Sequence, residues 1–100
     1  MTSEFEWVGV VMAKSPEGDA VAQVLGRLDG VEVKENPTFW DIRAKQRMSI
    51  SYDDVSEELG APIDGYQLQI EMSTHYGRMV HTDEALLLFA DFTEAMESVQ

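Results

Sequence analysis

The sequence predicts an α+β fold: one compact domain over residues 1–100, with mainly antiparallel sheets and two main helices. Strand-like segments follow one another in pairs, and apolar residues at helical spacing separate those pairs. This βαββαββ order differs from the regular strand–helix alternation of a parallel α/β protein. A chain of 100 residues with 44% hydrophobic residues also closes one core and leaves little room for a second.

The first strand and the first helix follow from local residue types. Residues 5–13 are rich in aromatic and β-branched side chains, which favours a strand. Residues 15–17, Ser-Pro-Glu, combine an N-cap serine, a first-turn proline and an acidic residue, which is typical of a helix start. Apolar residues then recur at helical spacing, with Gly30 as the expected C-cap: Val21, Val24, Leu25 and Leu28.

Two further strand segments and the second helix follow. Residues 31–35 form a short predicted strand, and Asn36 and Pro37 mark a turn. Residues 39–50 form one long strand or two strands joined by a bend; Trp40, Ile42 and Ala44 make its buried face. Residues 51–54 have the Ser-x-x-acid form of a capping box, so we expect a short helix that ends at Gly60.

The C-terminal part alternates between strands and irregular segments. Residues 66–72 alternate apolar and polar side chains and form the clearest predicted strand. Residues 73–77 interrupt this pattern, and residues 78–81 and 84–89 are predicted strands. Residues 91–100 carry apolar side chains at the spacing of a short helix.

Charge and composition exclude several classes of function. The chain has 19 acidic and 7 basic residues, a net charge of −12, so it lacks the basic surface that nucleic acids or anionic membranes require. The acidity either keeps the protein in solution or steers it toward a positive protein surface. The absence of cysteine excludes disulfides, thiolate zinc sites and iron–sulfur clusters. Without a leader-like N-terminus or a membrane-length apolar run, we expect a cytoplasmic protein.

The candidate catalytic residues do not form a pattern with known chemistry. His75 and His81 lack the local spacing of metal ligands, so we expect surface histidines. Ser73, Thr74 and His75 are adjacent in the sequence and cannot easily form a triad from one strand. No glycine-rich nucleotide-binding loop occurs. These observations favour a binding module over an enzyme.

Two smaller groups of side chains have competing interpretations. Arg43, Lys45 and Arg47 are predicted on one strand face, as solvated cations rather than an anion site. Met48 and Met72 follow strand alternation and are expected in the core, whereas Met79 either packs there or belongs to an adaptable binding surface.

An ordered set of segments resembles the coupling, or regulatory, proteins of bacterial multicomponent di-iron monooxygenases. The set consists of residues 36–37, 40–44, 55–60, 66–70 and 73–78, and the resemblance extends over about residues 8–89. The resemblance implies a non-catalytic subunit without metal or organic cofactor. It also implies two protein partners, the di-iron hydroxylase and the reductase of the same system, and a monomer when free. Members of this family adjust oxygen activation, substrate access and the coupling of NADH consumption to hydrocarbon oxidation.

The resemblance also implies where the hydroxylase binds. The expected contacts are Ser73, Thr74, His75, Tyr76, Gly77 and Arg78, with Asn36 as a secondary contact. Independently, the alternation of the preceding segment stops there, and Gly77 permits an irregular backbone. The alternative is that residues 73–74 finish a strand and Tyr76 packs in the core. At the level of function, a generic acidic protein-interaction domain and an enzyme that uses His75 or His81 remain open. The short chain is closer to the propane, alkene or phenol systems than to the methane system.

Overall fold

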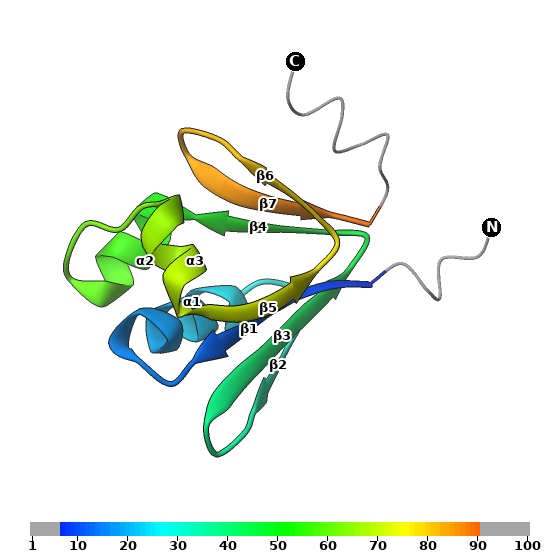
Figure 1. Cartoon of the computed structure of the whole chain (residues 1–100), viewed down its shortest axis with the longest axis horizontal. Coiled ribbons are helices and arrows are strands. Elements are labelled where there is room, and N and C mark those ends of the chain that lie inside the picture. Colours follow the sequence, from blue (N-terminus) through cyan, green and yellow to red (C-terminus); the bar gives the residue numbers. More distant parts are fainter. Residues whose placement is uncertain (1–6, 91–100) are drawn as a thin grey trace.

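Two antiparallel sheets and three helices make up residues 7–90, which are the residues that the computed structural model describes (Figure 1). The first sheet has the order β2-β3-β1-β5 and the second has the order β4-β7-β6. The strands of the first sheet are β1 (Trp7–Ala13), β2 (Val31–Glu35), β3 (Phe39–Lys45) and β5 (Met72–Tyr76). Those of the second are β4 (Arg47–Ser51), β6 (Arg78–His81) and β7 (Ala85–Phe89). The helices are α1 (Pro16–Gly26), α2 (Tyr52–Leu59) and α3 (Gly65–Glu71).

The predicted α+β class with antiparallel sheets is confirmed. The third helix adds to the two that the sequence predicts, and the segment 91–100, predicted as a helix, lies outside the described residues.

The chain passes from the first sheet to the second at two sharp corners. One corner is Gln46, between β3 and β4, with a φ of 71°; the other is Gly77, between β5 and β6, with a φ of 111°. Of the two options for residues 39–50, the two strands joined by a bend are therefore correct. Arg47 belongs to the second sheet, where it pairs with Phe89, so the prediction that it shares a strand face with Arg43 and Lys45 is wrong.

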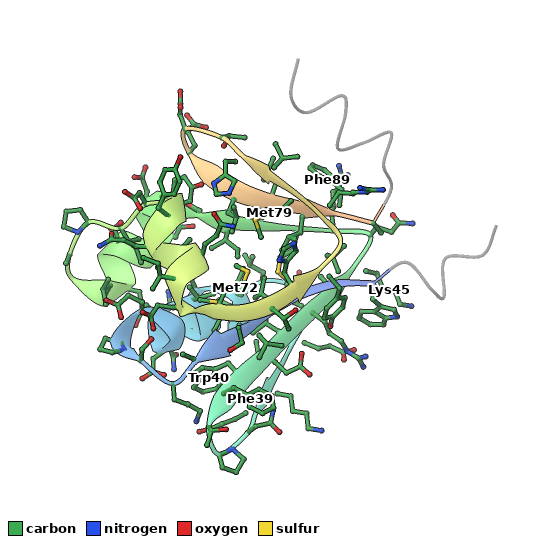
Figure 2. All side chains as sticks on the ribbon, viewed as in Figure 1. Phe39, Trp40, Lys45, Met72, Met79 and Phe89 are labelled. Carbon is green, nitrogen blue, oxygen red and sulfur yellow. The ribbon has the colours of Figure 1, made fainter. Side chains whose placement is uncertain are left out.

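The core fills the space between the two sheets and the helices. The inward faces of the strands alternate with solvated positions, as predicted for Ile42 and Ala44 on β3. The fully buried residues are Val8, Val10, Met12, Val21, Leu25, Ile42, Ile50, Val55, Leu68, Leu86 and Leu88. Met48 is buried, and Met72 and Met79 pack against this core from facing sheets (Figure 2). The core role predicted for Met48 and Met72 is confirmed, and Met79 shares it.

The predicted helix starts are confirmed by their caps. The Ser15 hydroxyl accepts a hydrogen bond from the Gly18 N–H at 3.0 Å, and the Ser51 hydroxyl accepts one from the Asp54 N–H at 3.3 Å. Gly60 ends α2 in the left-handed conformation, as predicted. Helix α1 ends at Gly26, before the expected cap at Gly30, and leaves Leu28 47% exposed.

The segment after α2 differs most from the structure that the sequence predicts. The predicted strand over 66–72 is wrong, because Gly65–Glu71 forms helix α3. The Asp64 carboxylate accepts a hydrogen bond from the Gln67 N–H at 2.9 Å and starts this helix. The predicted interruption at 73–77 is also wrong, since strand β5 runs from Met72 to Tyr76.

Candidate functional site

The expected contact segment occupies an edge strand. Strand β5 pairs with β1 on one side, and no strand of residues 7–90 pairs with its other side. Thr74 lies opposite Val11, His75 opposite Val10 and Tyr76 opposite Gly9. The register shifts between Met72 and Thr74, so Ser73 has no opposite residue and forms a bulge. The Ser73, Thr74 and His75 side chains are all exposed, so a partner can reach this edge.

The two faces of β5 point in different directions. Residues directly opposite each other in antiparallel strands share a face, so Thr74 and Tyr76 lie on the outer face of the sheet with Val11 and Gly9. His75 points to the other face, with Val10. This separation agrees with the expectation that Thr74 and His75 do not form a triad.

Tyr76 packs across the sheet onto a glycine. A Cβ at Gly9 would lie 2.5 Å from Tyr76 Cζ and Oη, so only glycine leaves room for the ring. The Tyr76 side chain stays 38% exposed on the outer face, and the alternative that it packs in the core is not what the structure shows. Partial burial raises the pKa of its phenol, the nearby Asp41 carboxylate raises it further, and Arg43 acts in the opposite direction.

Gly77 fixes the end of the exposed strand. A side chain at this position would be strained at a φ of 111°, and its Cβ would lie 2.7 Å from Val8 Cγ1 and 3.2 Å from the Phe89 carbonyl oxygen. The corner therefore packs directly on β1 and β7. Arg78 follows it as the exposed first residue of β6.

Asn36 lies apart from the other expected contacts. It is half-buried in the turn between β2 and β3, where its N–H donates to the Phe39 carbonyl oxygen at 2.9 Å. Strands β3 and β1 separate β2 from β5, which places the two edges about 14 Å apart at three strand spacings. The structure thus brings residues 73–78 together in one continuous surface and leaves Asn36 at the opposite edge of the sheet.

Comparison with known proteins identifies the family of this fold. The model of the MmoB/DmpM family matches residues 6–89, which is most of the chain. The chain belongs to the MmoB/DmpM family. Among curated proteins, this MmoB/DmpM chain is 40% identical over 91 residues to the effector components of propane 2-monooxygenase from Gordonia sp. (strain TY-5) and Rhodococcus jostii (strain RHA1). The matches cover 91% of this chain and 82% and 80% of those proteins, respectively.

Solved structures share the fold at lower identity. A phenol hydroxylase–regulatory protein complex matches with a TM-score of 0.74 and 20% identity, over 83% of this chain and 97% of the other. The soluble methane monooxygenase regulatory protein B matches with a TM-score of 0.72 and 20% identity, over 100% of this chain and 76% of the other. These structures support the fold, whereas the family match and the curated relatives show that the MmoB/DmpM protein is an effector component of a multicomponent monooxygenase and not its catalytic hydroxylase. The predicted regulatory, non-enzymatic role is confirmed, and the two alternative functions are set aside.

Two surface features of this MmoB/DmpM protein were not predicted from the sequence: the contacts of Trp7 with Arg43 and Lys45, and the exposed face of α3. On the outer face of the first sheet, the Arg43 guanidinium lies 4.4 Å and the Lys45 ammonium 5.5 Å from the centre of the Trp7 ring. On α3, Tyr66 and Ile70 are each 77% exposed. The Asp64 cap followed by Gln67 was the available signal for α3, whereas the Trp7 contacts depend on the pairing of β1 with β3.

Within the described residues 7–90, neither a cluster of metal ligands nor a membrane-spanning helix occurs. Between residues 7 and 90, no group of three or more His, Cys, Asp or Glu side chains is placed to hold a metal ion. No helix in that range is long and apolar enough to cross a membrane. His75 and His81 are both exposed, as predicted from the sequence.

Proposed function

We propose that this effector binds the di-iron hydroxylase of its monooxygenase through β5 and the corner at Gly77. The contact residues are Ser73, Thr74, His75, Tyr76, Gly77 and Arg78, with Asn36 as a secondary contact. The main support is the exposed edge strand, which is held in place by the Tyr76–Gly9 contact and by the packing of Gly77 on Val8. A rigid element that presents exposed side chains loses little conformational entropy when it binds a partner.

Binding regulates the hydroxylase by favouring one of its states. A partner protein shifts a conformational equilibrium by as much as its affinity differs between the two states. The favoured state is the one that couples oxygen activation and NADH consumption to hydrocarbon oxidation, with controlled access of substrate. The effector supplies binding energy for this shift and no cofactor.

The proposal extends to the rest of the system. The propane 2-monooxygenase effectors at 40% identity support a propane-type hydroxylase as the partner. A reductase delivers electrons from NADH to this hydroxylase, and the effector is a cytoplasmic monomer when free, folded as one domain.

The experiment compares wild-type effector with Thr74→Ala and His75→Ala in turnover with the hydroxylase, the reductase, NADH and propane. Wild-type protein should be silent alone and should increase the product formed per NADH. Both variants should fold, since exposed truncations usually cost less than about 0.5 kcal/mol of unfolding free energy. They should nevertheless lower the affinity or the coupling ratio.

The matched control is Ser49→Ala, another exposed polar position on an edge strand, but in the second sheet. It should behave like wild-type protein. Wild-type protein that changes neither rate nor coupling at any stoichiometry would contradict the function. Wild-type behaviour of both β5 variants would instead place the contact surface elsewhere.

A further inference from the structure

Helix α3 exposes two large apolar side chains on one face. Tyr66 and Ile70 are one helical turn apart, so they are neighbours on the helix surface. Each is 77% exposed, whereas Leu68 on the opposite side of the helix is fully buried. In a helix that only packs on the core, the solvent-facing positions 66 and 70 would be expected to carry polar residues.

Tyr66 and Ile70 are exposed because the contacts of α3 with the rest of the protein fix its orientation. The Asp64 cap fixes its start, and Leu68 anchors it in the core. A Cβ at Gly65 would lie 2.7 Å from both Tyr52 Oη and His81 Nδ1, so the first turn packs tightly on α2 and β6. Turning Tyr66 and Ile70 inward would require Leu68 to leave the core, and the two side chains therefore stay in solvent.

Acidic side chains lie around the exposed start of α3, where Tyr66 lines a hollow together with Asp53, Asp64 and Asp83. Residues 51–76, which include α2, α3 and β5, contain no Lys or Arg. The same residues contain six acidic side chains: Asp53, Asp54, Glu57, Glu58, Asp64 and Glu71. Helix α3 runs directly into β5, so this face is continuous in the chain with the proposed contact strand (Figure 1).

We infer that Tyr66 and Ile70 insert into an apolar groove of the hydroxylase whose rim carries Lys and Arg side chains. This second contact rests on the proposed function, because it assumes the same partner as β5. Large side chains that fill a desolvated pocket dominate the energy of many interfaces, and the acidic residues around them match a basic rim. A second copy of this chain fits less well, because two such faces would bring Asp53, Asp64 and Asp83 of one chain against the same carboxylates of the other.

The first test measures the affinity of Tyr66→Gln, Ile70→Gln and the double variant for the hydroxylase. Glutamine favours helices and removes the apolar surface, so thermal unfolding should stay unchanged. The dissociation constant of the double variant should rise about tenfold or more, as for the loss of interface hot spots. The control is Leu28→Gln, which removes an exposed apolar side chain outside α3 and should leave the affinity unchanged.

A second test follows from the absence of cysteine in the chain. Ile70→Cys and Leu28→Cys each give one labelling site for an environment-sensitive fluorophore. Addition of hydroxylase should shift the emission of the label at position 70 to shorter wavelength and leave that at position 28 unchanged.

Three outcomes would overturn the inference while wild-type protein still raises coupling. In the first, the double variant binds the hydroxylase with wild-type affinity and the emission of the label at position 70 does not shift. In the second, the double variant does not fold. In the third, sedimentation shows that Tyr66 and Ile70 hold two effector chains together. If wild-type protein itself neither binds nor changes the hydroxylase, the proposed function fails as well, so the two failures are distinguishable.

Discussion

Gly9, Tyr76 and Gly77 determine how the exposed strand ends. The Tyr76 ring occupies the space above Gly9, and the next residue turns the chain out of the first sheet with a φ of 111°. Gly77 also contacts Val8 and Phe89, one from each sheet. A change at any of these positions should therefore affect the stability of the protein as well as the position of β5.

At this scale, Gly77→Ala should destabilise the protein. The left-handed backbone alone costs an alanine about 1 kcal/mol of unfolding free energy, and the clash with Val8 should raise the total to about 2–3 kcal/mol. Chemical denaturation measures this loss. Gly30→Ala is the matched control, because Gly30 also has a positive φ, 84°, but nothing lies within 4 Å of an added Cβ. Equal losses for the two variants would show that the packing at Gly77 is unimportant.

The Tyr76 phenol should make stability fall at high pH. Its pKa in the folded protein is raised above the ordinary 10.0 by partial burial, with a smaller contribution from Asp41. Below the pKa of Tyr76 in the unfolded chain, the neutral phenol contributes fully to the free energy of unfolding. As the pH rises from that value toward the higher pKa of the folded state, the unfolded state loses its proton first, so the protein becomes less stable. Denaturation at several pH values above about 9 should give a flatter profile for Tyr76→Phe than for wild-type protein. Identical slopes would contradict this prediction.

Helix α3 shows why one element could not be predicted from apolar periodicity. Tyr66, Leu68 and Ile70 alternate with polar residues as in a half-buried strand, but only Leu68 is buried. Periodicity is informative when apolar residues face the core, and it fails when some of them face a partner. In β7 and in the helix that Ser15 caps, most of the apolar residues are buried in the core, and the sequence predicts both elements.

At the scale of the element, the Asp64 cap should hold α3 together. Asp64→Ala removes the acceptor for the Gln67 N–H and should cost about 0.5–2 kcal/mol of unfolding free energy. Asp64→Asn keeps an acceptor oxygen and should cost much less. Chemical denaturation with a helix-sensitive circular dichroism signal compares the two. If the asparagine variant is as unstable as the alanine variant, the cap is not what stabilises α3.

For the whole molecule, the class of fold is predictable but the arrangement of its edges is not. Residues 73–78 lie together because they are continuous in sequence, but the interrupted strand that singled them out does not exist: 65–71 is a helix and 72–76 is a strand. The distance between Asn36 and this group depends on the strand order β2-β3-β1-β5, which no local pattern contains. The side-by-side position of Trp7 and Arg43 likewise needs the register of β1 against β3.

The net charge of −12 should make hydroxylase binding sensitive to salt. If the acidic segment 51–76 steers the effector onto a basic surface, added salt screens the attraction and slows association. Stopped-flow measurement at low and moderate ionic strength should show the association rate falling more than the dissociation rate rises. A dissociation constant that does not change with salt would mean that the acidity only keeps the protein in solution.

The corners at Gln46 and Gly77 have a mechanical consequence for regulation. Strands β5 and β6 are one stretch of chain bent at Gly77, so β5 cannot slide along β1 without pulling β6 along β7. Sliding of β5 along β1 would therefore break two ladders of backbone hydrogen bonds together. We expect the effector to behave as a stiff template whose shape is nearly the same before and after docking, so that the hydroxylase undergoes the rearrangement that its regulation requires.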